Sequence, residues 1–132
     1  MSMHDLIAAV RGWRGPDPLP PLRAADLGLE RFPAGAVLLQ FSSVGSRNCR
    51  DSLNRLSEAA AHSGGRVAVV EQAIRRSSAL QTRLGVRFTP SVYVIAADGS
   101  IVHHWPRPPD RRELAQVLAV LGEGAPALAG IG

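Results

Sequence analysis

Gly35-Ala-Val-Leu-Leu-Gln-Phe-Ser-Ser-Val-Gly-Ser-Arg-Asn-Cys-Arg50 is the stretch of sequence that decides the fold. Its apolar part, Val37 to Phe41, lies between residues that break regular structure, which favours a central strand covered on both faces. A short polar turn follows, and the residues after it suit a helix. The stretch therefore predicts a strand, a turn and a helix start in direct succession, and the helix carries Cys49.

The helix after the turn is predicted to bury one face. Cys49, Leu53, Leu56 and Ala60 repeat at spacings of four, three and four, so they lie on the same side of a helix. Arg50 lies on another side. The pattern therefore places Cys49 on the stripe that faces the core.

The elements that follow alternate between strands and helices, with glycine or proline between them. They are a strand at 66–70, a helix at 77–84, a strand at 91–96, a returning strand at 101–105 after a hairpin turn, and a helix from Asp110. Before the central strand, Leu22 to Phe32 predicts a short strand or turn that leads into a helix. A strand, a helix and a strand in succession make a right-handed parallel unit, so the fold class is α/β with a mixed sheet.

The termini are predicted to lie outside the domain proper. Residues 1–21 form an N-terminal extension, with a short helix and a proline-rich linker that removes backbone donors. Residues 22–121 form one domain, and residues 122–132 form a flexible tail. The extension is either a loosely docked arm or an element that recognises a partner.

Composition narrows the class of protein. The chain has 132 residues and 45% hydrophobic content, which suits one compact core. All 15 basic residues are arginine and the net charge is +4, but the arginines are scattered, so a solvated surface explains them better than nucleic-acid binding. A single cysteine excludes an internal disulfide. No signal peptide or membrane span is apparent, so we expect a soluble, cytoplasmic protein without a membrane partner.

With these elements in place, the sequence resembles the thioredoxin-like superfamily over roughly residues 33 to 121. Val37 to Phe41 looks like the strand before the active site, and Ser46-Arg-Asn-Cys49 falls where that family carries Cys-x-x-Cys. Leu84 to Pro90 looks like the segment that leads to the family's cis-proline, and Asp98-Gly99 looks like its last hairpin turn. The resemblance implies a thioredoxin-like fold, with a mixed sheet of four to five strands flanked by helices.

The active-site motif departs from the family pattern at three places. Ser46 stands where the family has its nucleophilic cysteine. Val44-Gly45 stand where a tryptophan is usual, and Gln40 corresponds to the buried acid of many thioredoxins. A serine hydroxyl cannot form a disulfide, and a neutral amide cannot accept the proton of a thiol. The resemblance therefore implies a site that has lost ordinary dithiol turnover.

Several interpretations of Ser46 and Cys49 remain open. Ser46 suits an N-cap, because its oxygen can accept a bond from a free backbone N–H at the helix start. The positive end of the helix dipole, together with Arg47 and Arg50, favours a reactive thiolate at Cys49. Its place on the apolar stripe instead predicts a buried, inert thiol. An alternative register takes Cys49-Arg-Asp-Ser52 as a monothiol Cys-x-x-Ser motif, which requires a longer loop after the strand.

The resemblance also assigns a binding role to Thr89 and Pro90. In the family, the residue before the cis-proline, here Thr89, offers backbone hydrogen bonds to an extended polypeptide. The resemblance implies a groove formed by Ser46, Cys49, Thr89 and Pro90, and we expect Arg47 and Asn48 to contact the partner as well. The leading hypothesis is therefore a redox-attenuated protein that binds a polypeptide or client protein there. The alternative is a monothiol oxidoreductase in which Cys49 forms a mixed disulfide with glutathione or a client. No histidine has zinc-site spacing with Cys49, so neither a metal nor a cofactor is predicted.

Overall fold

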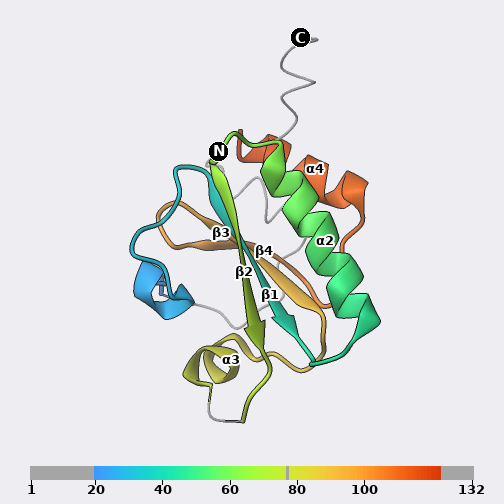
Figure 1. Cartoon of the computed structure of the whole chain (residues 1–132). Helices are drawn as coiled ribbons and strands as arrows, with labels where there is room; N and C mark the ends of the chain where they lie inside the picture. The colour runs from blue at the N-terminus through green and yellow to red at the C-terminus, as the bar shows by residue number, and fades with distance from the viewer. Residues whose placement is uncertain (1–19, 77, 123–132) are drawn as a thin grey trace.

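β1, residues Ala36–Ser42, is a central strand of a four-stranded sheet, and all seven of its residues are buried. The computed structural model describes residues 20–76 and 78–122. The other strands are β2 (Val67–Ala73), β3 (Ser91–Ala96) and β4 (Ile101–Trp105), in the spatial order β2-β1-β3-β4 (Figure 1). β1 pairs with β2 in parallel, whereas the β1–β3 and β3–β4 pairs are antiparallel. The prediction of an α/β fold with a mixed sheet is confirmed.

Helices cover both faces of this sheet, because alternate residues of β1 and β3 point to opposite sides. On one face α2 (Arg47–Ala61) and α4 (Arg111–Val120) enclose a core with Leu38, Leu56 and Val94. On the other face the 3-10 turn η1 (Ala24–Leu27) and α3 (Ala79–Leu84) pack with Leu39 and Tyr93. Figure 1 shows α2 and α4 together on one side of the sheet, with η1 and α3 on the other.

Three sequence predictions need correction. Between Leu22 and Phe32 the chain forms only the short η1, because Gly28 takes a left-handed conformation that ends it. α3 starts at Ala79 rather than at residue 77, because Ser78 is its N-cap. In α2, Ser52 is buried and Leu53 is only half-buried, so the inward face runs through Cys49, Ser52 and Leu56.

The hairpin between β3 and β4 holds the start of the domain in place. The backbone N–H of Leu22 donates to the carbonyl of Gly99 at 2.9 Å. Gly99 has φ +90°, and a Cβ built there would lie 2.1 Å from the Leu22 carbonyl oxygen. This position therefore requires glycine, because its φ is positive and because the backbone of Leu22 lies too close for a Cβ.

Three connecting segments meet at one end of the sheet. Ser42, the last residue of β1, pairs with Ala73 of β2, and Phe41 pairs with Ser91 at the start of β3. The loop before α2, the segment after β2 and the loop before β3 therefore meet at this end.

The predicted extension (1–21) and tail (122–132) lie almost wholly outside the described residues. Within the described part, no helix is long and apolar enough to cross a membrane.

Candidate functional site

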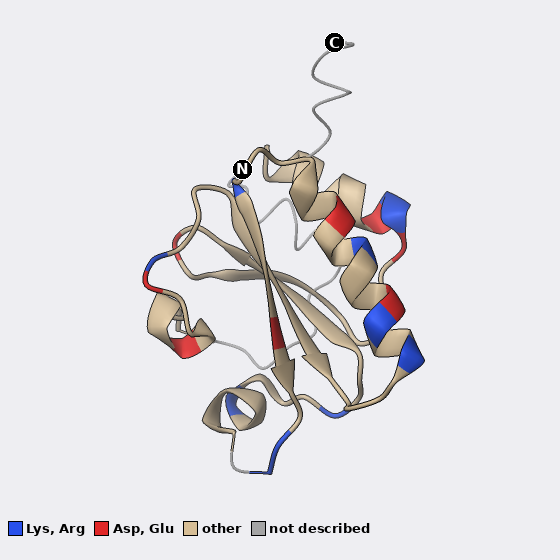
Figure 2. Ribbon diagram, in the orientation of Figure 1, with Lys and Arg blue, Asp and Glu red and all other residues tan. Residues whose placement is uncertain are grey.

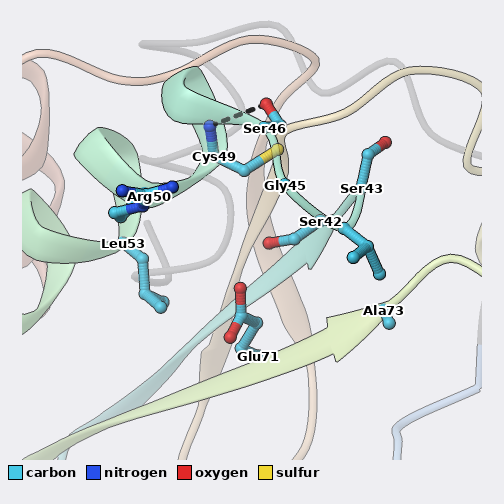
Figure 3. Close-up of a pocket in the computed structure, with 10 residues that line it drawn as sticks. Ser42, Ser43, Gly45, Ser46, Cys49, Arg50, Leu53, Glu71 and Ala73 are labelled. Atoms are coloured by element: carbon cyan, nitrogen blue, oxygen red, sulfur yellow. Dashed lines mark hydrogen bonds between the residues drawn. The ribbon is translucent and has the colours of Figure 1, made fainter.

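Ser46 forms the start of α2. It has an extended backbone, and its Oγ accepts a hydrogen bond from the backbone N–H of Cys49 at 3.2 Å (Figure 3). This is the N-cap arrangement that serine favours, because the first N–H groups of a helix have no partner within it. Arg47 and Asn48 lie exposed in the first turn. The Ser46 hydroxyl therefore has a structural partner already.

Cys49 is buried in the same turn. Its side chain is 2% exposed, and Figure 3 shows its sulfur directed toward the Gly45–Ser46 turn. It is a free thiol. Thiol exchange requires that a disulfide reach the sulfur, and burial at this level limits that approach.

Gln40 ties the first turn of α2 to the sheet. It is fully buried, and its Nε2 donates to the carbonyl of Cys49 at 2.8 Å and to Oγ of Ser42 at 2.9 Å. A carboxylate has no N–H to donate, so an acid at this position could not make these bonds. The sequence predicted that Gln40 removes a proton acceptor; the structure adds that its amide holds Cys49 in place. Its Oε1 has no hydrogen-bond partner among the described residues.

Thr89 and Pro90 lie at the same end of the sheet as Ser46. The Thr89–Pro90 peptide bond is cis, the form that the family resemblance implies. The hydroxyls of Thr89 and Ser43 share a hydrogen bond, which joins the loop before β3 to the loop before α2. Pro90 is buried and Thr89 is half-buried, so Thr89 is the more accessible of the two.

A pocket of about 370 Å³ opens between the start of α2, the loop after β1 and the end of β2 (Figure 3). Ten residues line it: Ser42, Ser43, Val44, Gly45, Ser46, Cys49, Arg50, Leu53, Glu71 and Ala73. Neither Thr89 nor Pro90 is among them. The pocket therefore lies on the β2 side of Cys49, and the cis-proline loop is a separate part of the site.

Glu71 is a pocket residue that the sequence reasoning missed. It pairs with Gln40 in the parallel register, and Figure 3 shows its carboxylate directed from β2 into the space below Cys49. An acid at the end of an apolar strand was the signal available in the sequence. Ser52, the serine of the alternative Cys49–Ser52 motif, is buried one turn beyond Cys49, and its Oγ has no hydrogen-bond partner among the described residues.

Three large apolar side chains are exposed on the loops at this end of the sheet. Val44 is 94% exposed, Phe88 is 66% exposed and Ile74 is 38% exposed. Within residues 20–76 and 78–122, they are the large hydrophobic residues that remain exposed. We call them the apolar rim. They lie on three loops that the sheet brings to the same end.

The histidines of β4 belong to the core rather than to this site. His103 and His104 lie on opposite faces, as neighbouring strand residues must. His104 stacks on Tyr93 with ring centroids 4.2 Å apart, and burial lowers the pKa of His104 to about 4. Burial also raises the pKa of Tyr93 to about 12. No three His, Cys, Asp or Glu residues in the described ranges lie close enough to hold a metal ion.

No protein-family model and no curated protein matches the sequence. Solved structures do match. The exposed lipoprotein thioredoxin Etrx1 of Streptococcus pneumoniae has a TM-score of 0.57 and 18% identity, over 67% of this chain and 86% of that one. A DsbF homologue from Corynebacterium diphtheriae has a TM-score of 0.57 and 16% identity, and the match covers 73% of this chain and 74% of that one. Thioredoxin-2 of the malaria parasite has a TM-score of 0.57 and 10% identity, and the match covers 64% of this chain and 82% of that one. At such identities the likeness establishes a thioredoxin-like fold and nothing finer.

Proposed function

Because the chain has a thioredoxin-like fold, we propose that it is a redox-attenuated protein that binds an extended polypeptide at the end of the sheet described above. The binding surface comprises the start of α2, with Ser46, Arg47 and Asn48, and the cis-proline loop, with Thr89 and Pro90. In this proposal Ser46 stands where thioredoxin-like proteins carry their nucleophilic cysteine.

The observation that carries the proposal is the contrast between the buried thiol and the exposed rim. Cys49 is 2% exposed, whereas Val44 and Phe88 are 94% and 66% exposed on the two loops beside it. When a partner covers an exposed apolar side chain, the burial favours binding by about 25 cal/mol per Å² of apolar area. The thiol of the site is thus buried, whereas the apolar side chains beside it are accessible to a partner.

The hydrogen bond at Ser46 supports the same view. Because α2 begins at Arg47 with Ser46 as its cap, Cys49 is in the first turn and Ser52 is in the second. This favours the Ser46–Cys49 register over the Cys49–Ser52 register, in which Cys49 itself would begin the helix. It also gives the serine a reason to be present that does not depend on catalysis.

Binding of a polypeptide that has no free thiol tests the proposal. The probe is insulin B chain with alkylated cysteines, followed by fluorescence anisotropy against the full-length protein. We expect binding by the wild type and by Cys49→Ala with equal affinity. The double variant Val44→Ser/Phe88→Ser should lose about tenfold or more in affinity, which corresponds to about 1.4 kcal/mol.

A matched control separates loss of contact from loss of folding. Ala25→Ser/Ala119→Ser changes two exposed apolar residues elsewhere on the surface and should bind as the wild type does. Equal binding by the rim variant and the control, or no binding by the wild type, would overturn the proposal.

A second candidate function is favoured by the pocket beside Cys49. In a monothiol oxidoreductase, the Cys49 thiolate attacks one sulfur of glutathione disulfide. A new S–S bond joins Cys49 to one glutathione, the original S–S bond breaks, and the second glutathione leaves as a thiolate that takes up a proton. The number of disulfides is unchanged. The pocket, which Cys49 lines together with Arg50 and Glu71, offers the leaving thiol a route to solvent.

Intact-mass measurement decides between the two functions. The native protein is incubated with glutathione disulfide, and Cys49→Ser serves as the control that cannot react. The binding protein should gain no glutathione until urea unfolds it. Rapid formation of the adduct under native conditions would favour the monothiol enzyme instead.

A further inference from the structure

An exposed arginine lies within three residues in the sequence of each member of the apolar rim. Arg47 and Arg50 lie at the start of α2, Arg75 and Arg76 follow β2, and Arg87 precedes the cis-proline; all five are exposed. We call them the arginine ring. Figure 2 shows basic ribbon in each of these three segments, at the end of the sheet where they meet. Each segment therefore combines an exposed apolar side chain with at least one exposed guanidinium.

The arginine ring has no ion-pair partner within the described part of the chain. The ion pairs there join Arg23 and Arg83 to Asp26, and two other arginines to glutamates on α2 and α4. Two carboxylates lie near the ring, Glu71 on β2 and Asp51 on α2, and neither pairs with it. Five unpaired guanidinium groups against two carboxylates leave a local excess of positive charge.

We infer that the polypeptide bound at this surface is acidic, with large apolar side chains between its carboxylates. This inference rests on the proposed function and names the chemistry of the partner. Arginine donates two parallel hydrogen bonds to a carboxylate, so each guanidinium of the ring can take one acidic side chain. The apolar rim takes the residues between them, and the positive field increases the rate of encounter.

A polypeptide suits this surface better than a nucleic acid. Two members of the apolar rim, Val44 and Ile74, are aliphatic, whereas single strands of nucleic acid stack their bases on aromatic rings. Binding of nucleic acid is therefore an outcome that the test must be able to detect.

Three peptide pools test the inference. Each holds fluorescein-labelled peptides of about ten residues, roughly 33 Å when extended, in which Val, Leu, Ile and Phe alternate with glutamate, lysine or serine. We expect the glutamate pool to bind the full-length protein about tenfold more tightly than the lysine pool, with the serine pool between them. The preference should shrink as the ionic strength rises from about 0.05 to about 0.3 M, because the screening length falls.

Charge-matched variants locate the effect. Arg75→Gln/Arg87→Gln should weaken binding of the glutamate pool about fivefold and leave the serine pool unchanged. Arg31→Gln/Arg112→Gln removes the same charge from exposed positions outside the ring and should change neither.

The outcomes distinguish this inference from the function on which it rests. Equal binding of the three pools, lost in Val44→Ser/Phe88→Ser, would overturn the inference and leave the proposed function intact. No binding of any pool or of alkylated B chain would overturn both. Tighter binding of a single-stranded oligothymidylate than of the glutamate pool would also overturn the inference, in favour of nucleic acid.

Discussion

Replacing Ser46 by alanine tests whether the serine is a structural cap. The substitution removes the oxygen that accepts the N–H of Cys49 at 3.2 Å and leaves that donor without its partner at a half-buried helix start. Losing an N-cap serine costs about 0.5 to 2 kcal/mol, and the long hydrogen bond points to the middle of that range. We therefore expect the free energy of unfolding to fall by about 1 kcal/mol.

Urea unfolding followed by circular dichroism measures this change. With a denaturant slope of about 2 kcal/mol per molar urea, the midpoint should fall by about 0.5 M without a change in slope. Ser46→Asp preserves an accepting oxygen at the cap and should restore a midpoint close to that of the wild type.

A serine in the middle of α2 provides the matched control. Ser57 is exposed, and alanine is the better helix former there, so Ser57→Ala should leave the protein as stable or more stable by a few tenths of a kcal/mol. If Ser46→Ala behaves like Ser57→Ala, Ser46 is not a cap in solution, and the argument that it has a non-catalytic role fails.

Three further predictions address other parts of the molecule. Cys49, at 2% exposure, should react with a thiol reagent about a hundredfold or more slowly in the native protein than in urea, and similar rates would contradict its burial. Burial lowers the pKa of His104 to about 4, so the unfolded state takes up a proton first as the pH falls below 6.5, and stability is lost. Linkage between these two pKa values gives about 2 kcal/mol from pH 7 to pH 5, and solvent screening at the half-buried ring reduces this to about 1 kcal/mol. By urea titration the wild type should therefore lose about 1 kcal/mol more over this range than His104→Gln, and equal losses would refute this. Gly99→Ala should lower the thermal midpoint much more than Gly65→Ala, because both have positive φ but only the first meets a backbone carbonyl; equal losses would show that the Leu22 contact is absent.

The sequence predicted most of the fold because its patterns are local. Val37 to Phe41 is apolar except for Gln40, and it lies in a fully buried central strand. Asp110 and Glu113 predicted the start of the last helix, and they form a reciprocal capping box there. Gly85 ends α3 in a left-handed conformation, as expected for a helix C-terminal glycine.

The parts that could not be predicted depend on contacts between distant segments. β2 continues through Glu71 to Ala73 because it pairs with β1 along its whole length, although its sequence turns polar there. Leu53 fits the apolar stripe of α2 as well as Ser52 does, and only packing against the sheet turns Ser52 inward. The hydrogen bonds of Gln40 likewise cross from β1 to α2, so an isolated sequence pattern cannot reveal them.

The candidate site likewise has a part that local sequence predicted and a part that depends on the fold. Ser46 and Cys49 are neighbours in sequence, and helix periodicity placed the thiol inward correctly. The apolar rim was not predicted, because Val44, Ile74 and Phe88 come from three loops that the sheet brings to one end. Each is an ordinary apolar residue in the sequence, and its exposure is a property of the fold.

Reduction of insulin disulfides in the presence of dithiothreitol tests the central claim most directly, namely that the fold is kept while the dithiol reaction is lost. The account predicts that the wild-type protein accelerates the reduction no more than Cys49→Ala does. Ser46→Cys serves as a positive control for the register, because it should form a disulfide with Cys49 that dithiothreitol reduces. Rapid turnover by the wild-type protein would contradict the account.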